Sequence, residues 1–159
     1  MEYKVVEKSA FQVIGKERTI TTVNGENLEL ITEFWADSAE DGTVEMLRGQ
    51  AGSLGLLGIC MNFDHAQSEL TYMIAVEKPA TEITGCFVER EISASTWVIF
   101  ESVGAIPEAI QNLWEKIFAQ WFPVEGYEPS SAPILEVYPI GNQKDAQYRC
   151  EAWVPVIQK

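Results

Sequence analysis

The chain has few positively charged residues. Its 159 residues include 11 Lys and Arg against 24 Asp and Glu, which gives a formal net charge of −13. A surface of that sign repels phosphate backbones and anionic lipid headgroups, and it attracts cations. We therefore expect no direct binding to nucleic acid or to a membrane, and we expect a charged small ligand to be a cation.

Long apolar runs, histidine and paired cysteines are also scarce. No stretch reaches the roughly 18 apolar residues that span a bilayer, and the first residues lack the layout of a signal peptide. Cys60, Cys86 and Cys150 show no CxxC spacing, and the single histidine, His65, has no His or Cys nearby. These absences argue against a membrane span, a disulfide framework and a metal site. We expect a cytoplasmic protein with reduced thiols, no metal and no cofactor.

The composition and patterning predict one globular α+β domain over residues 1–159. Hydrophobic residues make up 47% of the chain and charged residues 22%, as in ordinary folded domains. The first half predicts a strand or bent strand pair over 3–17, a helix that starts near Asn24 or Asn27 and stops before Gly42, and strands over 54–63 and 70–76. The second half predicts a strand over 95–103, a helix between Pro107 and Pro123, and strands over 134–138 and 147–156.

The two halves share this order and predict a duplication. LLGICMNF from Leu56 aligns without a gap on ILEVYPIG from Ile134. We expect two βαββ repeats, over about residues 1–80 and 81–159, related by a pseudo-twofold axis. Their strands would form an antiparallel sheet with the two main helices on one face and a ligand cleft on the other.

Residues 95–156 resemble the gyrase-inhibitor-like, or AraC-type effector-binding, domain family. The shared pieces are Gly104, the helix end at 113–123, GYEP at 126–129, E-x-Y-P at 136–139 and E-x-W-x-P at 151–155. The resemblance implies two βαββ repeats around a ligand cleft. Family members include effector-sensing domains of multidrug-responsive transcription regulators, free-standing drug-binding proteins, the gyrase inhibitor and hydrolases of cyclopropane-bearing toxins. Because the sequence predicts no helix-turn-helix, we expect a free-standing member.

Two glutamates on the last strands are the candidate ligand-binding residues. Glu136 shares a strand face with Tyr138, and Glu151 shares one with Trp153. A carboxylate beside an aromatic ring suits a planar cation, because the ring adds roughly 0.5–2 kcal/mol of cation–π attraction and the carboxylate neutralises the buried charge. The resemblance implies that ligand-contacting residues of the family lie at these four positions. We expect Trp97 and Met73 to complete the wall of the site.

Other interpretations remain open at this point. Glu151 and Arg149 would suit an ordinary solvated ion pair on an exposed sheet face. Glu136 and Glu151 would also suit a hydrolase of electrophilic toxins, with one carboxylate as general base and the other as acid. The acidic charge would suit an interaction with a basic protein partner. No Ser–His–Asp, Cys–His or metal set is visible in the sequence, so binding is favoured over catalysis.

The helix of the second half carries a broad apolar stripe. Because its members recur at helical spacing, we expect Trp114 and Trp121 to pack in the core and not to contact a ligand. We also expect Cys60 and Cys150 to be packing residues, since no basic neighbour is visible that would lower a thiol pKa.

Overall fold

The computed structural model describes residues 1–83 and 85–159, which form nine strands and three α-helices. The strands are β1 (Tyr3–Lys8), β2 (Phe11–Thr21), β3 (Leu56–Asp64), β4 (Glu69–Glu77), β5 (Val88–Ile92), β6 (Ser95–Val103), β7 (Tyr127–Pro129), β8 (Ile134–Tyr138) and β9 (Arg149–Gln158). The helices are α1 (Asn27–Glu40), α2 (Thr43–Gln50) and α3 (Glu108–Lys116), and a π-helical turn over Ile117–Trp121 extends α3.

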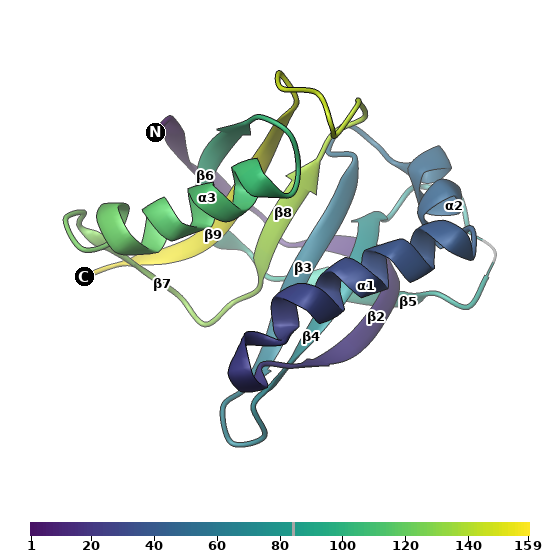
Figure 1. Cartoon of the computed structure of the whole chain (residues 1–159), viewed down its shortest axis with the longest axis horizontal. Helices are drawn as coiled ribbons and strands as arrows, with labels where there is room; N and C mark the ends of the chain where they lie inside the picture. Colours follow the sequence, from purple (N-terminus) through teal and green to yellow (C-terminus); the bar gives the residue numbers. More distant parts are fainter. Residues whose placement is uncertain (84) are drawn as a thin grey trace.

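All the strands belong to one antiparallel sheet. Eight of those described follow the order β1-β6-β9-β8-β3-β4-β2-β5, and β7 pairs with β9. Figure 1 shows the helices on one side of this sheet, with α1 over one half and α3 over the other. Helix α1 packs on β2, and α3 packs on β6 and β9. The predicted α+β architecture, an antiparallel sheet with the main helices on one face, is confirmed.

The centre of the sheet lies where the two halves of the chain meet. In the strand order, β6, β9 and β8 lie on one side of this centre, and β2, β4 and β3 lie in the mirrored order on the other side. The β3–β4 pair and the β8–β9 pair meet edge to edge, because β3 pairs with β8 from Leu56↔Tyr138 to Cys60↔Ile134. A common origin of the two halves stays a prediction.

Both faces of the sheet are covered by apolar packing. On the helix side, one hydrophobic cluster lies under α1 and α2 around Phe34, Leu47 and Ile74, and a second lies under α3 around Phe100 and Ile117. Strand alternation sends every second side chain to this side. The burial of these apolar faces fixes where the helices sit on the sheet.

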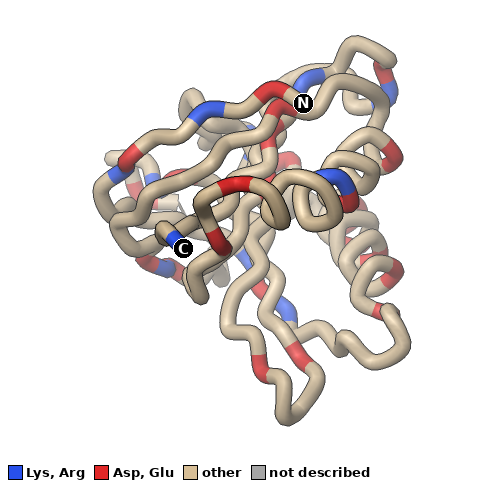
Figure 2. The backbone as a smooth tube through the Cα atoms, turned by 90° about the vertical axis from the view of Figure 1, so that its left-hand side faces the viewer, with Lys and Arg blue, Asp and Glu red and all other residues tan. Residues whose placement is uncertain are grey.

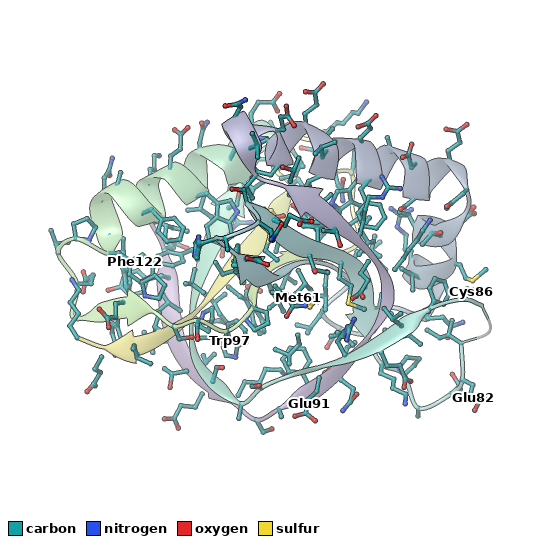
Figure 3. The ribbon with its side chains drawn as sticks, turned by 90° about the horizontal axis from the view of Figure 1, so that it is seen from below. Met61, Glu82, Cys86, Glu91, Trp97 and Phe122 are labelled. Atoms are coloured by element: carbon teal, nitrogen blue, oxygen red, sulfur yellow. The ribbon has the colours of Figure 1, made fainter. Side chains whose placement is uncertain are left out.

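The other face holds a third hydrophobic cluster. Its central members include Met73, Trp97, Leu135 and Trp153. Figure 3 shows Trp97 and Met61 inside the curve of the sheet. We expected an open ligand cleft on this face. The side chains pack against one another there instead, because the curved sheet brings them together.

Acidic residues are spread along the helices and the strands (Figure 2). Five of the eleven Lys and Arg side chains pair with Asp or Glu, among them Lys16 with Asp41 and Arg18 with Asp37. Most acidic residues therefore add to an uncompensated negative field. Among the described residues, no helix has the length and hydrophobicity that a membrane crossing requires.

Candidate functional site

Glu136 lies near the centre of the sheet, on the side that carries the helices. Its strand, β8, runs between β3 and β9, where Glu136 is opposite Gly58 on one side and Ala152 on the other. Neither neighbour has a side chain large enough to crowd the carboxylate. Glu136 is half-buried.

Aromatic donors surround the Glu136 carboxylate. Trp114 Nε1 donates to Oε2 at 2.8 Å, Tyr138 Oη donates to Oε1 at 3.0 Å, and Tyr72 Oη donates to Oε1 at 3.4 Å. Tyr72 in turn accepts a hydrogen bond from Trp35 Nε1 at 2.8 Å. We call Glu136 and these four aromatic residues the Glu136 site.

Different layers of the fold supply these side chains. Tyr72 lies on the same face of β4 as the buried Leu70 and Ile74, which places it on the helix side. Trp35 follows the buried Phe34 in α1 and contacts Tyr138 edge-on, with 5.7 Å between ring centroids. The indoles of Trp35 and Trp114 are both half-buried. Trp114 contacts the Glu136 carboxylate directly, and Trp35 is connected to it through Tyr72.

The Glu136 carboxylate has no basic partner among the described side chains. Desolvation by its surroundings raises the pKa of Glu136 above 4.5, and the hydrogen bonds from Trp114, Tyr138 and Tyr72 offset part of that rise. Burial also raises the pKa of Tyr72 and Tyr138, so both hydroxyls stay protonated donors at neutral pH. A bound cation would relieve the cost of keeping this carboxylate ionised.

Cys60 lies near the site on β3. Desolvation, together with the negative charge of Glu136, raises the pKa of its thiol to about 12. The thiol is therefore protonated at neutral pH and a poor nucleophile. Cys150 is buried, and its pKa is raised to about 11, again mainly by desolvation. The arrangement favours non-covalent binding at the carboxylate.

The six predicted site residues fall on two faces of the sheet. Glu136 and Tyr138 lie together on the helix side. The other four point to the concave side: Glu151, Trp153, Trp97 and Met73. Because the sheet separates the two sets, one small ligand cannot contact both.

Glu151 has its own surroundings on the concave side. Trp153 Nε1 donates to Glu151 Oε1 at 3.1 Å, and the Trp153 ring packs edge-on against Trp97 with 5.6 Å between centroids. Arg149 pairs with Glu101, not with Glu151. Both indoles are almost fully buried, so little of their surface is open to a ligand.

A separate cavity of about 700 Å³ lies beside β5. Phe87 is the one aromatic side chain among the described residues that line it. Its basic residues are already paired, Lys78 with Glu89 and Arg90 with Glu17. The lining also includes Glu82, which pairs with no basic side chain among the described residues. The cavity differs from the Glu136 site in offering one aromatic ring instead of four.

Comparison with known proteins agrees with the fold and with the sequence resemblance. The GyrI-like small molecule binding domain family matches residues 1–157. The chain belongs to this family.

Solved structures give the same result. SAV2435, in a structure bound to tetraphenylphosphonium, superposes with a TM-score of 0.86 and 26% identity over 99% of this chain and 94% of its own. A Staphylococcus aureus protein described as a "putative bacterial transcription regulation protein" gives a TM-score of 0.81 and 25% identity, with 98% of both chains covered. An integron cassette protein of Vibrio cholerae shares the fold at 0.72 and 14%, over 98% of this chain and 95% of its own. No curated protein is a significant match.

Sequence patterns in this GyrI-like domain missed three members of the Glu136 site. Tyr72 and Trp35 were not predicted to contact a ligand. Trp114 packs against the hydrophobic core, as expected, but its hydrogen bond to Glu136 was not predicted. Trp114 is half-buried and uses its indole N–H at Glu136. The available signal was strand alternation, which puts Tyr72 on the opposite face from Met73 and on the face of Leu70.

Proposed function

We propose that this GyrI-like domain binds a small, cationic, aromatic molecule at the Glu136 site. The observation that carries the proposal is a half-buried carboxylate that lacks a basic partner among the described residues and is surrounded by aromatic side chains. A cation would supply the missing charge, and the rings would add roughly 0.5–2 kcal/mol of cation–π attraction. The tetraphenylphosphonium bound to SAV2435 is a ligand of this chemistry.

The same proposal extends to the role of the domain. We infer an effector-binding protein that senses or sequesters drug-like cations, with a link to transcription regulation through a partner. The similarity to a bacterial transcription regulation protein at 25% identity supports that link. The net charge of −13 would draw cations toward the domain.

Direct binding can be tested with tetraphenylphosphonium. Because Trp35 and Trp114 both belong to the Glu136 site, we expect the ligand to change tryptophan fluorescence in a saturable titration. Triphenylphosphine oxide, which has similar rings but no net charge, should bind about 10-fold more weakly or worse. Equal affinity for both compounds, or no saturable change with the cation, would contradict the proposal.

The affinity for the cation should depend on pH. The pKa of Glu136 lies above 4.5 in the folded domain, so the carboxyl takes up a proton at a higher pH than an exposed glutamate does. As the pH falls through that raised pKa, the charge that attracts the cation is lost and tetraphenylphosphonium binding weakens. Titrations from about pH 8 downward, as far as the domain stays folded, measure the midpoint. The neutral phosphine oxide is the control and should show a flat profile; a flat profile for the cation would count against Glu136.

A further inference from the structure

Gly58 occupies a position where the backbone does not require glycine. It lies within β3, which is paired on both sides, and it faces Ile74 on β4 and Glu136 on β8. Its φ is not among the positive values of the chain. Glycine inside a strand loses more conformational freedom on folding than alanine does. The reason for glycine at position 58 therefore lies in its surroundings.

The space beside Gly58 is filled by the hydroxyl of Tyr72. A Cβ on residue 58 would overlap Tyr72 Oη, and it would lie 3.1 Å from Tyr72 Cζ and 3.4 Å from Glu136 Oε1. Tyr72 is 1% exposed, so its ring has little room to move aside. The hydroxyl also accepts a hydrogen bond from Trp35 and donates one to Glu136, and both contacts fix its position.

We propose that Gly58 is a positioning residue of the Glu136 site, which keeps open the space from which the Tyr72 hydroxyl bridges Trp35 of α1 and Glu136 of β8. Its effect on ligand binding rests on the function proposed above, whereas the bridge itself can be tested without ligand. Through this bridge, an aromatic residue of the first helix is connected to the carboxylate that Trp114 of α3 contacts from the other side.

A double-mutant cycle tests whether Gly58 acts through the Tyr72 hydroxyl. Gly58→Ala should lower the Tm by roughly 5–10 °C in the natural sequence, because it forces the buried hydroxyl from its partners. In a Tyr72→Phe background the hydroxyl is gone and the 3.1 Å contact with Cζ needs only a small shift. In this background Gly58→Ala should lower the Tm by less than about half of the loss that it causes in the natural sequence. Gly126→Ala, whose Cβ would meet nothing within 4 Å, is the control and should change little in either background.

Two further measurements separate positioning from general destabilisation. The indole N–H resonance of Trp35 should shift in Gly58→Ala and in Tyr72→Phe alike, while that of the distant Trp121 stays in place. The pH midpoint for tetraphenylphosphonium binding should rise in each variant, and no further in the double variant, because the Tyr72 hydrogen bond that lowers the pKa of Glu136 is lost only once.

Each outcome has a defined meaning. An equal Tm loss in both backgrounds, or an unmoved Trp35 resonance in Gly58→Ala, overturns the assignment of Gly58. If Gly58→Ala alone does not fold, a folded double variant supports the assignment and an unfolded one overturns it. If the natural chain does not bind tetraphenylphosphonium, the proposed function fails, while the Tm cycle and the resonance still decide the role of Gly58.

Discussion

Replacing Glu136 by glutamine is expected to weaken tetraphenylphosphonium binding by about 30-fold or more at neutral pH. Removing one partner of a buried charge pair typically costs about 2–5 kcal/mol of binding free energy. Glutamine keeps the size of the side chain and can still accept from the two tyrosines. Its amide nitrogen, which would take the place of Oε2, cannot accept from Trp114 Nε1, which donates to Oε2 at 2.8 Å. Isothermal titration calorimetry or fluorescence titration measures the loss, and circular dichroism checks that the variant is folded.

Glu151→Gln is the matched control for this experiment. Glu151 is also half-buried and also accepts from an indole, but it lies on the concave side of the sheet. We expect its substitution to change the affinity less than about 2-fold. The reverse result, a large loss in Glu151→Gln and none in Glu136→Gln, would place the ligand beside Glu151, Trp153, Trp97 and Met73, four of the six residues that the sequence predicted.

Replacing Trp97 by alanine is expected to lower the free energy of unfolding by about 3–5 kcal/mol, the usual cost of removing a fully buried tryptophan side chain. Trp97 is 0% exposed, lies between Val6 of β1 and Pro155 of β9, and packs edge-on against Trp153. Its Nε1 has no hydrogen-bond partner among the described residues. The loss therefore comes from packing and from the cavity that remains.

Chemical denaturation of Trp97→Ala measures this loss. Val124→Ala, at a side chain that is 78% exposed, is the control and should change the unfolding free energy by less than about 0.5 kcal/mol. At a temperature where Trp97→Ala is folded, its affinity for tetraphenylphosphonium should match that of the natural chain, because the sheet separates Trp97 from Glu136. A loss below about 1 kcal/mol would show that Trp97 is not a core residue.

The strands that carry Glu136 and Tyr72 were predictable because their pattern is regular. Residues 134–138 form β8, as predicted, and residues 70–76 lie within β4. The shared face of Glu136 and Tyr138 follows from a period of two. The sequence pattern did not predict which face of the sheet the helices cover. On β4, Tyr72 and Ile74 are buried on one face and Met73 and Ala75 on the other, so hydrophobicity does not distinguish the faces.

Short and exposed elements escaped prediction for a related reason. Strand β5 has four exposed residues out of five, and β7 has only three residues, so neither offers a run of apolar alternation. The indole of Trp114 shows a different limit of periodicity. Helical spacing marks a residue that turns toward the sheet, and it does so equally for a core contact and for a donor to a carboxylate.

The carboxylate and its tyrosines belong to the sheet, whereas the two indoles belong to the helices. A change at Glu136 or Tyr72 disturbs a central strand with neighbours on both sides, so such positions can drift only together with those neighbours. Trp35 and Trp114 sit on half-buried helix surfaces, outside the pairing of the strands. Under the proposed function, evolution would therefore adjust which molecules the domain accepts by altering the helices, while the charged centre is inherited with the sheet.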